Sequence, residues 1–130
     1  MEQLIVLFED IGTACQVTLD DTQSPNTVAA LKKVLPIRVA FNPWGKELYS
    51  NPLPIRFKEE GAHGSVPLGA AAIWPPGSAL CLFLGKTPIG AENEIRPASP
   101  VNIIGRVVEP WPEDLIKNLG MTSMAMVRIA

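Results

Sequence analysis

The sequence has few of the residues that metal and redox sites need. Its 130 residues include one histidine and two cysteines, and Cys15 and Cys81 are too far apart to match a zinc or redox motif. Since a closed zinc site takes four such ligands, we expect no structural or catalytic metal and no cofactor. We also expect both cysteines to be free thiols, as is usual in a reducing compartment.

Charge is scarce as well. Charged residues make up 18% of the chain and the formal net charge is −2, so the basic surface of a nucleic-acid-binding protein is missing. The apolar run Leu4–Phe8 follows Met1–Gln3, which includes no basic residue, and it is too short for a signal sequence or a membrane span. We therefore expect a cytoplasmic protein that binds neither nucleic acid nor membrane.

Apolar residues, proline and glycine are abundant instead. Hydrophobic residues make up 47% of the chain, which is typical of a compact protein, and 130 residues suit one domain. The 13 prolines and 10 glycines interrupt long helices and favour short strands joined by tight corners. Without a linker or an internal repeat, residues 1–130 are expected to form a single domain.

Alternation of apolar residues predicts most of the strands. Residues 15–19, 37–41 and 125–129 each place apolar side chains at every second position, the pattern of a strand with one buried face. Further strands are expected at Leu4–Phe8, Lys46–Ser50, Pro54–Lys58, Ala70–Trp74, Ala79–Leu84 and Val101–Val108.

Two short helices are also expected. Ser24 offers an N-cap side chain and Pro25 a preset φ, so a helix is predicted over Thr27–Leu35, before Pro36. A second is predicted over Glu113–Leu119. About eight strands with two short helices indicate a mainly β fold, a closed barrel without exposed sheet edges whose ends the helices cover.

Three stretches of the chain and one arginine resemble cyclophilins. Gly77–Thr87 is similar to the central cyclophilin strand, and Gly105–Glu109 is similar to the end of a later strand. Pro25–Val28 resembles the start of the first cyclophilin helix, and Arg38 follows it where cyclophilins have their catalytic arginine. This resemblance implies a cyclophilin-like barrel and raises the question of prolyl isomerisation.

A small bacterial and archaeal family with a minimal cyclophilin-like barrel is more similar still. Its hallmarks are present as Trp44-Gly45, Trp74–Gly77, Ala79–Phe83 and Pro97–Asn102. On these residues the chain is identified as a member of the cyclophilin-like superfamily. This resemblance implies the fold without an established activity.

Most groups of the cyclophilin cleft are replaced. Ala79 stands in the place of the cleft glutamine, Cys81 in that of a pocket phenylalanine, and residues 101–103 lack the cleft histidine. Of the residues that the resemblance assigns to isomerisation, Arg38 remains. An isomerase must grip the proline while it stabilises the twisted amide, so one arginine is a poor basis for catalysis.

We therefore predict a non-catalytic module with a shallow apolar cleft for a peptide or a small molecule; no protein partner is indicated. Two alternatives stay open: an enzyme, either a low-activity prolyl isomerase or a different chemistry using Asn102 and loop acids, and a subunit of a larger enzyme assembly. Arg38 is equally explained as an exposed residue of its strand. Trp44 and Trp74 lie beside prolines in turns and either line a pocket or pack over a barrel end. The predicted cleft residues are Arg38, Phe41, Trp44, Cys81, Phe83 and Asn102.

Overall fold

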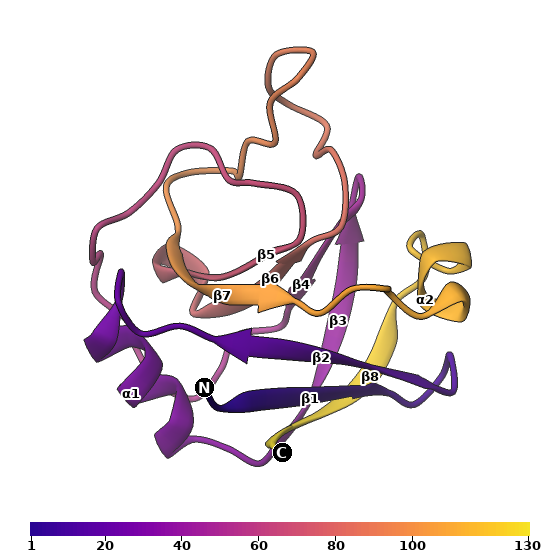
Figure 1. Ribbon diagram of the computed structural model, residues 1–130, viewed down its shortest axis with the longest axis horizontal. Helices are drawn as coiled ribbons and strands as arrows, with labels where there is room; N and C mark the ends of the chain where they lie inside the picture. Colours follow the sequence, from indigo (N-terminus) through magenta and orange to yellow (C-terminus); the bar gives the residue numbers. More distant parts are fainter.

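The computed structural model describes residues 1–130 as a closed barrel of eight antiparallel strands (Figure 1). Around the barrel the order is β1-β2-β7-β5-β6-β4-β3-β8. The strands are β1 Gln3–Phe8, β2 Thr13–Leu19, β3 Ile37–Trp44, β4 Glu47–Ser50, β5 Ala70–Trp74, β6 Ala79–Phe83, β7 Asn102–Val107 and β8 Ser123–Ile129. The predicted mainly β, closed barrel is confirmed.

The two helices lie at opposite ends of the barrel in Figure 1. They are α1 Pro25–Lys33 and α2 Glu113–Lys117, each shifted by up to two residues from its predicted bounds, and a 3₁₀ turn η1 spans Pro75–Gly77. Leu31 of α1 and Leu115 of α2 are fully buried in the barrel's interior core. Neither helix has the length and apolar character that crossing a membrane requires.

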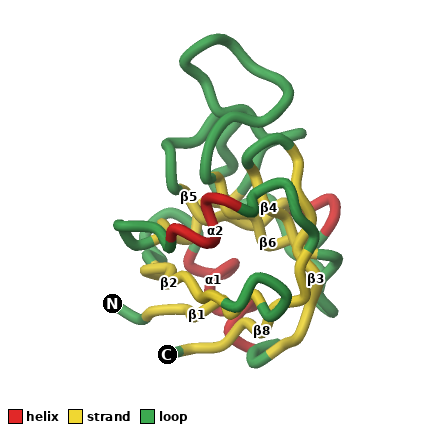
Figure 2. Tube along the Cα trace, turned by 90° about the vertical axis from the view of Figure 1, so that its right-hand side faces the viewer, coloured by secondary structure: helices red, strands yellow, loops and turns green.

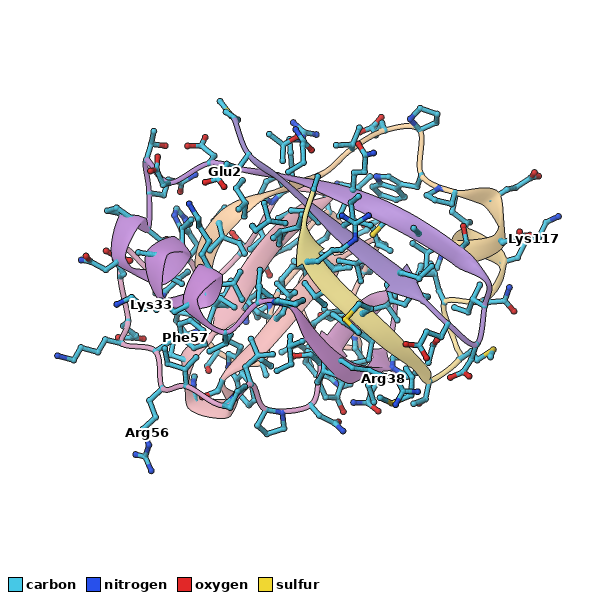
Figure 3. All side chains as sticks on the ribbon, turned by 90° about the horizontal axis from the view of Figure 1, so that it is seen from below. Glu2, Lys33, Arg38, Arg56, Phe57 and Lys117 are labelled. Carbon is cyan, nitrogen blue, oxygen red and sulfur yellow. The ribbon has the colours of Figure 1, made fainter.

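The predicted strand at Pro54–Lys58 is wrong, because that segment is irregular. Pro52 and Pro54 have no backbone N–H to offer a neighbouring strand. The Lys58 carbonyl accepts a hydrogen bond of 2.8 Å from the side chain of Asn102 instead of joining a strand ladder. Figure 3 shows Arg56, in the middle of this segment, projecting away from the molecule.

Helix α1 begins where Ser24 and Pro25 predict, but Ser24 does not cap it. The Ser24 hydroxyl donates to the carbonyl of Ile103 at 2.8 Å. The Glu60 carboxylate accepts from the backbone N–H groups of Asn26 and Thr27, at 3.1 and 2.8 Å, and from the Thr27 hydroxyl at 2.8 Å. Partial burial acts to raise the pKa of Glu60, but these hydrogen bonds outweigh it and lower the pKa overall. A carboxylate distant in sequence therefore closes the first turn of α1.

Asn102 fastens this loop and helix to the barrel. Its side chain is fully buried. The Asn102 Oδ1 accepts from the backbone N–H of Glu60 at 2.8 Å, and Nδ2 donates to the Thr27 hydroxyl at 3.0 Å as well as to Lys58. One amide thus joins β7, the loop at residues 58–60 and the start of α1.

We expect Asn102→Ala to lower the free energy of unfolding by about 2–4 kcal/mol, because it leaves several polar groups without partners in a buried place. Urea unfolding followed by circular dichroism measures this. The control is Asn118→Ala, which removes a solvent-exposed hydrogen bond of 2.7 Å to the Asp114 carbonyl and is expected to cost less than about 1 kcal/mol. Equal stability of the two variants would contradict the prediction.

Strand β6 is buried on both of its faces. Leu80 and Leu82 point into the interior core, whereas Ala79, Cys81 and Phe83 belong to a second apolar cluster on the outer face of the barrel. The outer cluster comprises Val66, Ala70, Ala72, Ala79, Cys81, Phe83, Val101 and Ile103. The loop at residues 84–101 and the later part of the loop at residues 51–69 gather on this side, where Val66 pairs with Ile95. Figure 2 shows green loop segments above β4 and β5. The region where these loops meet the outer face of the sheet contains the candidate site.

Candidate functional site

A cavity of about 220 Å³ opens between the outer face of the barrel and the loop that precedes β7. Strands supply most of its wall and the loop at residues 97–101 supplies the rest. Its lining residues are Trp44, Glu47, Tyr49, Trp74, Cys81, Pro97, Ala98 and Val101.

Strand geometry explains why Glu47 faces this cavity. Alternation along β4 sends Leu48 into the interior core and places Glu47 and Tyr49 on the outer face. The β3–β4 register pairs Glu47 with Trp44, and the β4–β6 register pairs Tyr49 with Cys81. Four cavity residues therefore come from neighbouring positions on three strands, which fixes their relative places.

The wall at Trp74 is preformed. Its indole Nε1 donates to the Ser99 hydroxyl at 2.7 Å, so β5 is tied to the covering loop. The Trp74 ring also lies directly over Gly77 in η1, where an added Cβ would come within 2.6 Å of ring atoms. The Trp74 ring is therefore held in place at the cavity by its packing on the Gly77 backbone and by the hydrogen bond from its Nε1 to Ser99.

Glu47 is the one acidic group of the cavity, and it is 5% exposed. Burial raises the pKa of Glu47 to about 7, and a hydrogen bond with the Cys81 thiol opposes that rise. None of the five ion pairs in the protein includes Glu47. The cavity therefore presents a carboxyl that no cation of the protein neutralises and that changes its protonation near neutral pH.

The Cys81 thiol beside Glu47 is held in its protonated form. Burial raises the pKa of Cys81 well above its ordinary value, and the charge of Glu47 raises it further. Since the thiolate is the nucleophile, this cysteine is suited to packing rather than covalent chemistry. Both cysteines are free and buried.

The structure brings two of the six predicted cleft residues to this cavity, Trp44 and Cys81, together with Trp74. Arg38 lies on the surface, where its guanidinium donates to both carboxylate oxygens of Glu9 at 2.9–3.1 Å (Figure 3). Of the remaining three, Phe41 packs in the interior core, Phe83 in the outer cluster, and Asn102 in the hydrogen-bond network described above.

Glu47 and Tyr49 were not predicted as site residues. The sequence does contain a pattern that could have identified them. Alternation places Glu47 and Tyr49 on the same face of a strand, and a tight turn joins this strand to Trp44. Pro97, Ala98 and Val101 fall within a family hallmark, but no local pattern places that loop over β4 and β6. No three histidine, cysteine or carboxylate side chains cluster in a way that could hold a metal ion.

The sequence profile of the Cyclophilin-like family matches residues 2–128 of this chain. The chain belongs to the cyclophilin-like family. Among solved structures, this cyclophilin-like barrel is similar to the hypothetical protein AF2241 from Archaeoglobus fulgidus. The two share 40% sequence identity over 99% of this chain and 95% of that one, with a TM-score of 0.79.

The cyclophilin-like barrel also matches the structure of McbB in complex with tryptophan, with a TM-score of 0.74 and 14% identity. The match covers 96% of this chain but 44% of McbB, so the barrel corresponds to less than half of that protein. At this identity the likeness concerns the fold alone. A comparison with curated protein sequences finds no match.

Proposed function

We propose that this cyclophilin-like barrel is a non-catalytic binding module whose ligand occupies the cavity between Trp44, Glu47 and Trp74. The observation that carries the proposal is a preformed, largely apolar cavity with one buried polar group, the usual composition of a small-molecule site. Its volume of about 220 Å³ lies below the roughly 300–1,000 Å³ of drug-sized pockets. The ligand is therefore a small molecule or a single side chain of a peptide.

Two further facts support binding over catalysis. Cys81 stays protonated, and the cavity has no histidine, serine or lysine to pair with Glu47 in a nucleophilic mechanism. McbB, which shares the fold, has been solved with tryptophan bound, and this is in keeping with a barrel that accepts small ligands.

The isomerase alternative has less support, since Arg38 does not line the cavity and is engaged by Glu9. A role as a subunit of a larger assembly is compatible with the proposed cavity, because a partner subunit would bind to other surfaces of the barrel. We also propose a cytoplasmic location, which is supported by two free cysteines.

Nuclear magnetic resonance can test the proposed site through the three tryptophans of the chain. Trp44 and Trp74 line the cavity, whereas Trp111 packs against Gly69 elsewhere and serves as an internal control. We expect members of a panel of indole, phenol, imidazole, benzylamine and benzyl alcohol to shift the indole N–H signals of Trp44 and Trp74 in a saturable way. The Trp111 signal is expected to stay in place.

Ala98→Trp is the matched blocking variant, because Ala98 is exposed at the rim of the cavity and its replacement fills the opening without disturbing the core. Affinity for any probe that binds is expected to fall at least about tenfold, a loss of about 1.4 kcal/mol. If no probe shifts Trp44 and Trp74, or if Ala98→Trp binds as the parent does, the proposed function is refuted.

A further inference from the structure

We propose that the ligand of this cavity is an organic cation, a protonated amine or a quaternary ammonium, whose charge Glu47 neutralises while its apolar part packs on Trp44 and Trp74. This inference rests on the proposed function and adds the chemical class of the ligand. It is carried by three observations: a buried acid without a charged partner, an aromatic wall around it, and neighbouring basic side chains that all lie outside the cavity.

The unpartnered acid is the first observation. Glu47 is 5% exposed, yet it belongs to no ion pair. No N–H or O–H group of the protein donates to its carboxyl, and the weakly donating Cys81 thiol beside it also lies 3.8 Å from the Ala79 carbonyl. A buried carboxylate is costly unless a cation or several donors compensate it. Because the protein supplies neither, a cation from outside the chain would remove this cost on binding.

The aromatic wall is the second observation. Trp44, Tyr49 and Trp74 line the same small cavity as Glu47. The faces of tryptophan and tyrosine attract organic cations that lie within about 6 Å of the ring centre, most strongly where water is excluded. A carboxylate combined with aromatic faces therefore favours an ammonium group over an anion, which Glu47 would repel.

The third observation is that nearby basic side chains do not supply the missing charge. The side chain of Lys46 lies against Gly85, where an added Cβ would come within 2.6 Å of it. Lys86 donates to the Glu92 carbonyl at 2.9 Å, and Arg96 forms an ion pair with Glu94. None of the three lines the cavity, so the place beside Glu47 is left for the ligand.

Titration of Glu47 gives this inference a signature that a neutral ligand lacks. Burial raises the pKa of Glu47 to about 7, and the titratable groups facing it are Cys81 from β6 and Tyr49 from its own strand. A bound cation favours the ionised carboxylate, so affinity for an amine should rise from pH 6 to pH 8. At pH 6.5, binding should release up to one proton per site, since much of Glu47 is then protonated.

The experiment compares matched probes that differ in charge: benzylamine against benzyl alcohol, and cyclohexylmethylamine against cyclohexylmethanol. Affinities are measured at pH 8 by calorimetry and by the Trp44 and Trp74 indole signals. We expect each amine to bind at least about tenfold more tightly than its alcohol, as one charge-assisted contact provides. In Glu47→Gln this preference, measured as the ratio of amine to alcohol affinity within the variant, is expected to vanish. Glu92→Gln, which removes an exposed acid of the covering loop, is the matched control and should behave as the parent.

The outcomes separate the two proposals. Amines and alcohols of equal affinity at Trp44 and Trp74 would overturn the cation and leave the binding module intact. The same holds if indole or phenol binds there and no amine does. If no probe binds, both proposals fail. Calorimetry of the parent protein with benzylamine at pH 6.5, in two buffers of different ionisation enthalpy, needs no variant, and the absence of proton release would also overturn the cation.

Discussion

Replacing Gly105 by alanine is expected to lower the free energy of unfolding by about 3 kcal/mol or more. A Cβ at this position of β7 would lie 1.9 Å from the Thr18 carbonyl oxygen and 3.0 Å from its carbon. Both are backbone atoms of β2, which pairs with β7 directly opposite, so no side-chain rotation can relieve the contact. Forcing atoms into a packed interior costs about 1–3 kcal/mol even where side chains can adjust, and here strands must separate.

Strand β7 cannot shift away from β2 freely, because its other edge pairs with β5. Gly105 faces Ala71 there, next to a register shift between Ala71 and Ala72. Chemical denaturation followed by circular dichroism measures the effect. Gly64→Ala is the control, since a Cβ at Gly64 meets nothing within 4 Å, and its effect is expected to stay within about 1 kcal/mol. A Gly105→Ala protein as stable as Gly64→Ala would show that β2 and β7 can separate without cost.

We compare the free energy of unfolding of Glu47→Gln with that of the parent protein. The difference, variant minus parent, is expected to be about 2–3 kcal/mol larger at pH 8 than at pH 5. The pKa of Glu47 is raised from 4.5 to about 7 in the folded protein, so the folded state binds this proton more tightly than the unfolded state. The resulting stability is fully present below about pH 4.5 and is lost as the pH rises through about 7. At about 1.4 kcal/mol for each pH unit of difference, the loss between pH 5 and pH 8 reaches the stated size.

Urea unfolding of both proteins at pH 5, 6, 7 and 8 provides the comparison. Carboxyls whose pKa is lowered, such as Glu9 by its hydrogen bonds from Arg38, are common to both proteins and cancel in the difference. Glu92→Gln should follow the parent at every pH. A stability difference between Glu47→Gln and the parent that stays constant from pH 5 to pH 8 would mean that Glu47 does not titrate in this range.

The barrel was predictable because its strands carry local information. Alternation at residues 15–19 and 37–41 marks which side chains face inward, and these segments fold as parts of β2 and β3. The failure at Pro54–Lys58 has a long-range cause, since Asn102 takes the Lys58 carbonyl. Ser24 failed as a cap for the same kind of reason, because its hydroxyl finds the distant carbonyl of Ile103.

The candidate site was predictable only in part. Trp44 and Cys81 were found through the family resemblance, and both line the cavity. Glu47 was missed because a glutamate in a short strand is ordinarily exposed. Its burial here depends on the loop from Pro97 to Val101, 50 to 54 residues farther along the chain, which folds back over β4. Local patterns reveal which face a residue occupies, but not whether a remote loop covers that face.

The capping of α1 by Glu60 has a consequence for how the chain assembles. A helix of nine residues is too short to persist alone in water. Its first turn is closed by groups 33 and 75 residues farther along the chain, from Glu60 and Asn102. Bringing together residues so far apart in the chain costs conformational entropy before the stabilising contacts can form. This cost slows folding. We therefore expect helix α1 to form as the barrel closes rather than to nucleate it, although it stands near the beginning of the sequence.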